Sequence, residues 1–169
     1  MGISWSEKLS ENIVTSWSKW TQDVTALATW KIPRCLRRFD DIPIEYQLHT
    51  FTGASEYAYG AATYLRCTYE DKSVTVSLVM AKSRVAPVHQ LSTPRLELQP
   101  GVFGYRLMEV VKKELDLPIT ATIYWTDSLT VLQWIHSKSR RFKAFVGHRV
   151  GEILRGIASK AVAPCSRCA

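Results

Sequence analysis

The sequence predicts an α/β fold, a mixed sheet with flanking helices, and three observations lead to that prediction. Residues 74–81 alternate apolar and polar side chains, which is the period of a half-buried strand. Two strand-like runs, at 47–52 and 57–67, precede it, so three antiparallel strands follow one another. A helical pattern at 93–115 then leads to a strand at 119–126. The order strand, helix, strand implies a parallel crossover.

Length and composition favour one folded domain with a short leader. The chain has 169 residues, 46% of them hydrophobic and 22% charged, so it can bury a core. No run reaches the roughly 18 uncharged apolar residues of a membrane span, and the N-terminus lacks the shape of a signal peptide. Four cysteines are too few for a small secreted disulfide scaffold. We therefore expect a soluble, intracellular protein, cytoplasmic or nuclear, with no membrane partner.

The N-terminal residues 1–45 are interpreted as a helical tether and linker. Residues 5–30 show one apolar stripe at helical spacing, as expected of a helix packed on a core. Pro33 ends this helix because a proline disfavours helical backbone in the residue before it. The stripe consists of Ile13, Trp17, Trp20, Val24 and Leu27.

The helix predicted over 93–115 has a clear start and one internal conflict. Thr93 can cap it, and Pro94 suits the first helical position. Pro100 falls inside the helix, where it removes the bond to the Leu96 carbonyl. We expect this proline to cost about 3 kcal/mol or to bend the helix.

Two further helices and a tail complete the predicted order. Ser128 can cap a short helix, and residues 142–158 form another apolar stripe. The domain is therefore placed at 46–158. Residues 159–169 show no period and are interpreted as an irregular tail.

All of the net charge of +7 lies in the last quarter of the chain. Residues 1–127 hold 14 basic and 14 acidic side chains, whereas residues 128–169 hold eight basic ones against Glu152 alone. Such a segment attracts phosphate backbones or acidic surfaces. The alternative is a solvated face that only keeps the protein soluble.

Two acids stand where predicted strands and helices meet. Glu97 lies one turn into the helix at 93–115, and Asp127 ends the strand at 119–126. Carboxylates that converge in this way serve hard-metal binding or proton transfer. Taken singly, Glu97 also fits a surface helix acid and Asp127 a helix cap.

Several ordered stretches carry a resemblance to a known family. The chain over roughly 5–155 resembles the ribonuclease H-like region that follows the reverse transcriptase in polyproteins of BEL/Pao-type retrotransposons. The leader is similar to the tether that joins these two regions. The matching stretches are His49–Ala61, Val79–Pro87, Pro94–Leu98, Tyr124–Ile135, Phe145–Val146 and Arg149–Ile153.

The resemblance implies cleavage of RNA in RNA–DNA hybrids by two divalent ions, magnesium or manganese, held by four acids. Glu97 matches the second acid and Asp127 the third. The first acid falls at Gly53, in a Thr-Gly-Ala-Ser stretch where the family has Thr-Asp-Ala-Ser. The fourth acid belongs after the last matching stretch and is not reached. We therefore expect a C-terminally incomplete copy whose cleavage is impaired or lost.

Nucleic-acid binding can outlast cleavage, because the family grips hybrids through phosphates and 2′-hydroxyls. The partners implied are an RNA–DNA hybrid or other nucleic acid, and a reverse transcriptase domain of the same polyprotein. Two alternatives stay open: a non-catalytic nucleic-acid-binding remnant and an unstable pseudogene product. The candidate contacts are Ala54, Ser55, Lys138, Arg140, Arg141 and Lys143.

The cysteines give a weaker indication of a metal. Cys165 and Cys168 have the spacing of half a zinc site. No second pair with this spacing occurs in the sequence, so zinc is not expected.

Overall fold

The computed structural model describes residues 6–31, 35–38, 40–86, 93–137, 142–156 and 162–165. Its contacts divide the chain into two compact units, Met1–Arg34 and Cys35–Ala169. The first unit contains the predicted helix, α1 (Glu11–Ala26), which a short 3₁₀ turn, η1 (Leu27–Thr29), continues. The rings of Trp17 and Trp20 lie 5.0 Å apart on this helix. None of the described helices is long and apolar enough to cross a bilayer.

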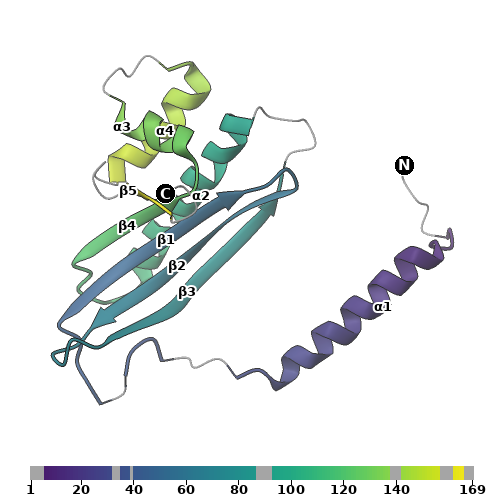
Figure 1. Ribbon diagram of the computed structural model, residues 1–169, viewed down its shortest axis with the longest axis horizontal. Helices are drawn as coiled ribbons and strands as arrows, with labels where there is room; N and C mark the ends of the chain where they lie inside the picture. The colour runs from purple at the N-terminus through teal and green to yellow at the C-terminus, as the bar shows by residue number, and fades with distance from the viewer. Residues whose placement is uncertain are drawn as a thin grey trace. The chain divides into compact units, whose positions relative to one another are not determined.

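The second unit is a five-stranded mixed sheet with helices (Figure 1). The strands lie in the order β3-β2-β1-β4-β5. β1 pairs antiparallel with β2, and β2 with β3, whereas β4 runs parallel to β1. This confirms the predicted meander and parallel crossover. The elements are β1 (Glu45–Ala54), β2 (Ala58–Thr68), β3 (Val74–Val85), α2 (Thr93–Glu114), β4 (Ala121–Thr126), α3 (Leu129–His136), α4 (Ala144–Gly156) and β5 (Val162–Pro164).

The interpretation of residues 159–169 as an irregular tail misses one element. Val162–Pro164 form β5, which pairs parallel with β4. Val162 is buried, and the Cys165 N–H donates to the Thr126 carbonyl at 3.0 Å. Three residues are too few to show the alternation of apolar and polar side chains that identifies a strand in a sequence. β5 is a strand because it pairs with β4.

The linker residues after Arg34 contact the sheet. The Arg38 N–H donates to the Tyr69 hydroxyl at 2.9 Å, and the Ser77 hydroxyl donates to the Leu36 carbonyl at 3.2 Å. These bonds fix residues 35–38 beside β2 and β3.

The core lies between the sheet and α2, which crosses one face (Figure 1). In β1 the side chains of Tyr46, Leu48, Thr50 and Thr52 are buried on this face. The intervening side chains from Gln47 to Phe51 are half-buried or exposed on the opposite face. One cluster joins α2 to β4, α3, α4 and β5, and a second joins the far end of α2 to β1 and β2.

The helix α2 approaches β1 closely because Gly104 has no side chain. A Cβ built on Gly104 would lie 2.4 Å from Thr52 Cγ2 and 2.8 Å from the Tyr124 hydroxyl. The helix also runs through Pro100, as predicted. The buried Tyr124 hydroxyl donates to the carbonyls of Pro100 and Gly101, at 3.2 and 2.5 Å. Burial raises the pKa of this phenol, so it remains a donor.

Candidate functional site

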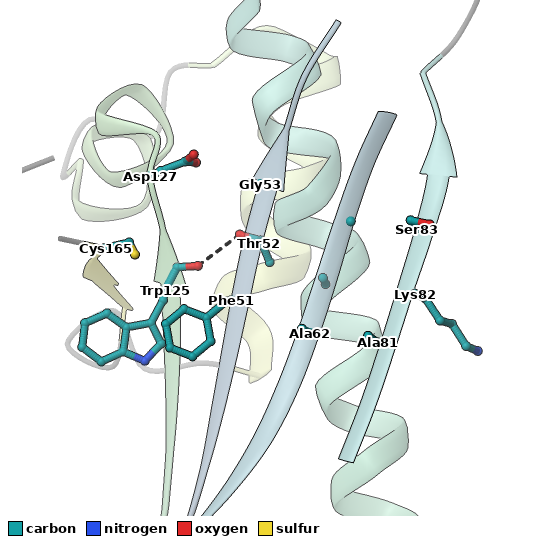
Figure 2. A pocket seen from close by; sticks show the side chains of 12 residues that line it. Phe51, Thr52, Gly53, Ala62, Ala81, Lys82, Ser83, Trp125, Asp127 and Cys165 are labelled. Carbon is teal, nitrogen blue, oxygen red and sulfur yellow. Dashed lines mark hydrogen bonds between the residues drawn. The ribbon is translucent and has the colours of Figure 1, made fainter. Parts of the chain in front are cut away.

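Asp127 and Gly53 face each other at the ends of two neighbouring strands. Thr52 of β1 pairs with Thr126 of β4, so the next residues along both strands are adjacent. A Cβ built on Gly53 would lie 3.9 Å from Asp127 Oδ2, and no other atom of the described residues is within 4 Å of it apart from its chain neighbours. Figure 2 shows the Asp127 carboxylate beside the strand that carries Gly53. Position 53 therefore has room for a side chain, and that side chain would meet Asp127.

Glu97 reaches the same end of the sheet from α2. Its Oε2 accepts a hydrogen bond of 2.6 Å from the hydroxyl of Ser128, the residue after Asp127. The Ser128 hydroxyl also accepts the Val131 N–H at 3.1 Å, which caps α3 as predicted. The hydrogen bond from Ser128 thus holds Glu97 beside the start of α3. The two acids singled out in the sequence come from different elements, and Glu97 is bonded to the residue that follows Asp127.

These residues do not fit a two-ion site. In the described part of the chain there is no group of three or more His, Cys, Asp or Glu side chains that could hold a metal. Two carboxylates hold magnesium weakly, because this ion keeps several waters and needs further oxygen ligands. Clamping both the attacking and the leaving oxygen of a phosphodiester takes two ions, hence more ligands. Gly53 supplies no side-chain carboxylate at the position that faces Asp127.

A hollow of about 530 Å³ opens next to Asp127 (Figure 2). Small side chains of β1, β2 and β3 form its floor, and two aromatic rings border it. Cys165 also lines the hollow. Cys168, which has the spacing of a zinc ligand pair with Cys165, lies outside the described residues. The lining comprises Phe51, Thr52, Gly53, Gly60, Ala61, Ala62, Ala81, Lys82, Ser83, Trp125, Asp127 and Cys165.

The predicted nucleic-acid contacts fall into three groups. The Ser55 hydroxyl donates to the Ala58 carbonyl at 3.1 Å and accepts the Tyr57 N–H at 3.3 Å, so it stabilises the β1–β2 turn. Ala54 ends β1 and is half-buried. Lys143 is exposed, and its carbonyl accepts the first N–H groups of α4. Lys138, Arg140 and Arg141 lie outside the described residues, and all six contacts stay predictions.

A row of aromatic side chains on the open face was missed in the sequence. Phe51 and Trp125 are parallel within 7° at a centroid distance of 5.7 Å, and Tyr64 meets Phe51 edge-on at 5.7 Å. The Trp125 indole N–H donates to His49 Nδ1 at 3.0 Å. Burial, and then the charge of Arg66, lower the pKa of His49, which favours the neutral ring that this bond requires. The sequence contained one indication of this row: His49 and Phe51 are two residues apart on one strand, so their rings lie on the same face of the sheet.

The strand order, with α2 packed across one face of the mixed sheet, is that of a ribonuclease H-like α/β domain. The model of the Pao retrotransposon-like RNaseH-like domain family matches residues 1–128. This range covers α1 to β4 together with Gly53, Glu97 and Asp127, and the chain belongs to that family. No curated protein matches the sequence.

Solved ribonuclease H structures are similar to the chain at low identity. RNase H1 from the archaeon Halobacterium salinarum is 8% identical, with 73% of this chain and 86% of that chain covered and a TM-score of 0.42. The N-terminal RNase H domain of a Mycobacterium tuberculosis protein is 10% identical, with coverage of 73% and 83% and a TM-score of 0.44. The foamy viral protease-reverse transcriptase in complex with RNA/DNA hybrid is 10% identical, with coverage of 95% and 24% and a TM-score of 0.43.

Proposed function

We propose that this domain of a retrotransposon polyprotein binds RNA–DNA hybrids and has lost most or all of the cleavage typical of its fold. The observation that carries the proposal is Gly53, which faces Asp127 where the family resemblance implies the first acid. Of the described residues, only Asp127 would meet a Cβ at position 53, so a side chain there bears on the candidate site and not on the buried core.

The loss of one carboxylate is severe for two-metal chemistry. In the family the first-strand acid bridges both ions, and a glycine offers no side-chain carboxylate. Glu97 and Asp127 alone would hold at most one weakly bound magnesium or manganese ion. We therefore expect hydrolysis at or near the background rate.

Binding of the hybrid does not need these carboxylates. Basic side chains between 128 and 169 supply charge for phosphates, and Lys143 among them is exposed. Recognition of a hybrid by its backbone and 2′-hydroxyls uses shape more than sequence. We propose the same polyprotein's reverse transcriptase as a second partner, reached through the exposed apolar stripe of α1, which includes Trp17 and Trp20.

The decisive experiment is cleavage of a labelled RNA–DNA hybrid by the purified chain in magnesium and in manganese. Asp127→Asn is the matched control, because it keeps the shape of the side chain and removes its charge. We expect the wild-type chain and this variant to be equally inactive. Cleavage that disappears in Asp127→Asn would overturn the proposal, and Glu56 in the β1–β2 turn would then be the next acid to test.

Restoring the missing acid separates metal binding from activity. Gly53→Asp places a second carboxylate against Asp127, so without metal the repulsion should lower the melting temperature. Magnesium should then stabilise this variant, by about 1.4 kcal/mol at 10 mM if its Kd is roughly 1 mM. The control Gly53→Asn should gain no such stability. We expect Gly53→Asp alone not to restore full cleavage, and full turnover would contradict the four-ligand argument.

The competing proposal is an unstable remnant without a fixed fold. Two clusters of buried side chains support the folded alternative. A single cooperative thermal transition is the expected result, and its absence would favour the remnant.

A further inference from the structure

The imidazole of His49 holds the indole of Trp125 on the face of the sheet opposite α2. We propose that this pair is a pH-sensitive switch, in which protonation of His49 releases the Trp125 ring and changes the wall of the hollow beside Asp127. The inference concerns a conformational change within the domain. It goes beyond the proposed binding of hybrids and does not depend on it.

A chain of hydrogen bonds along β1 fixes the state of the imidazole. The Trp125 indole N–H donates to His49 Nδ1 at 3.0 Å, and His49 Nε2 lies 3.1 Å from Gln47 Oε1. The Gln47 amide in turn donates to Glu45 Oε1 at 2.9 Å. An indole N–H can only donate, so Nδ1 must be the bare nitrogen and Nε2 must carry the proton. One neutral tautomer of His49 therefore satisfies every bond in the chain.

Protonation of His49 removes the bond to Trp125 and no other bond of this chain. The imidazolium carries an N–H on both nitrogens, so Nδ1 can no longer accept the indole N–H, and the two N–H groups would face each other. The bond from Nε2 to Gln47 persists, because Nε2 is a donor in both forms. The change therefore acts on the side of the imidazole that holds the tryptophan.

The Trp125 ring can move without disturbing the core. It is half-buried, and of the described residues neither it nor His49 belongs to the two clusters of buried side chains. Its other ring contact is Phe51, which is parallel to it within 7° at a centroid distance of 5.7 Å. Both rings line the hollow, and Figure 2 shows them side by side. Movement of Trp125 would therefore alter the hollow and leave the fold intact.

Two opposite charges surround His49 among the described residues. Arg66 on β2 contacts Gln47 Oε1 at 3.4 Å, and Glu45 on β1 lies 3.9 Å from Arg66, so it offsets part of that charge. Burial, and next the charge of Arg66, lower the pKa of His49 below its usual 6.5. Release is therefore expected on the acid side of this value. The other side chains that neighbour His49 from β2 and β4 are the titratable Tyr64 and the uncharged Ile123 and Trp125.

The test follows the Trp125 indole N–H and the His49 ring protons of the full chain by NMR, between about pH 7.5 and about pH 5. Trp125→Phe and His49→Gln assign these signals. We expect the indole N–H to lose its protection from exchange with water. The NOEs between the Trp125 and Phe51 rings should disappear with the same midpoint, which should equal the measured pKa of His49. Unchanged methyl signals of the buried Leu65 would show that the fold is retained.

Three variants separate the switch from a general effect of acid. In His49→Gln the Trp125 signals should no longer change over this range. His148→Gln is the matched control, because it removes an exposed imidazole of α4 and should leave the midpoint as in the wild type. Arg66→Gln removes the cation near His49, so the midpoints of the imidazole and of the indole should rise together.

Four results would overturn the inference. His49 could titrate while the indole bond and the ring NOEs stay as they are, or the change at Trp125 could persist in His49→Gln. The two midpoints could separate in Arg66→Gln. His49 could also stay neutral until the whole chain unfolds in acid, which would leave no folded state with a released ring. None of these results bears on the binding or cleavage of hybrids, so the proposed function stands or fails by its own assays.

Discussion

Replacing Gly104 with alanine tests how closely α2 must approach β1. The new Cβ would lie 2.4 Å from Thr52 Cγ2, about 1 Å short of the 3.4 Å at which ordinary contact begins, and 2.8 Å from the Tyr124 hydroxyl. Both neighbours are buried, so the helix itself must shift. Overpacking of this kind costs about 2–3 kcal/mol, whereas alanine gains about 1 kcal/mol of helix propensity. We expect a net loss of about 1–2 kcal/mol.

The chain provides a matched control on another helix. Gly151 lies in α4, is exposed, and has no atom of a described residue within 4 Å of a built Cβ. Alanine at this position should therefore stabilise the protein by up to about 1 kcal/mol. The two variants should differ by about 2–3 kcal/mol in urea unfolding. That corresponds to roughly 6–9 °C in melting temperature for a chain of this size.

Whether Gly104→Ala lowers the stability while Gly151→Ala does not tests how closely α2 packs on β1. A Gly104→Ala variant as stable as Gly151→Ala would show that α2 packs farther from β1 than described. An equal loss in both variants would point to a cause other than steric overlap. Only a loss confined to Gly104→Ala agrees with the packing of α2 against Thr52.

Three further predictions concern single contacts. Ser128→Ala removes the α3 cap and the partner of Glu97, so urea unfolding should show a loss of about 1–2 kcal/mol, with partial recovery in Ser128→Thr. The pKa of His49 is lowered on folding, so its contribution to stability is complete above about pH 6.5 and declines as the pH falls toward the lower folded value. Urea unfolding at pH 7.5 and 5.5 should show this decline, and His49→Gln should flatten it. Arg106→Ala removes an exposed ion pair to Glu152 and should cost under about 1 kcal/mol. In that variant the pKa of Glu152, lowered chiefly by its hydrogen bond to Arg106, should rise in an NMR titration.

Local patterns predicted most of the sheet and its helices. The alternation around Val74 marks β3, and the proline before Arg95 marks the start of α2. Neither signal depends on distant parts of the chain. β5 could not be predicted, because its three residues are a strand only through their pairing with β4. The sequence also contains no mark of the close contact at Gly104, since a glycine inside a helix has several possible reasons.

The places of the candidate site residues in the fold were predictable in part, for the same reason. Strand and helix ends identified Asp127 and Glu97, and the family resemblance pointed to Gly53 as the altered position. The hydrogen bond from Ser128 to Glu97 depends on how α2 lies across the sheet, which no local pattern specifies. The aromatic row depends on register, because Phe51 and Trp125 are neighbours only when β1 and β4 pair in parallel.

A side chain at position 53 would have few contacts among the described residues, so this position can affect the candidate site without affecting the stability of the fold. Of the described residues, only Asp127 would contact a side chain at position 53, so the pairing of β1 with β2 and β4 should not depend on which residue stands there. Replacing an acid there would also relieve repulsion with Asp127 when no cation is present. Under the proposed loss of cleavage, a change from acid to glycine at position 53 would therefore leave the packed core intact. The domain would keep its fold, whereas the loss of a buried side chain commonly destabilises a protein.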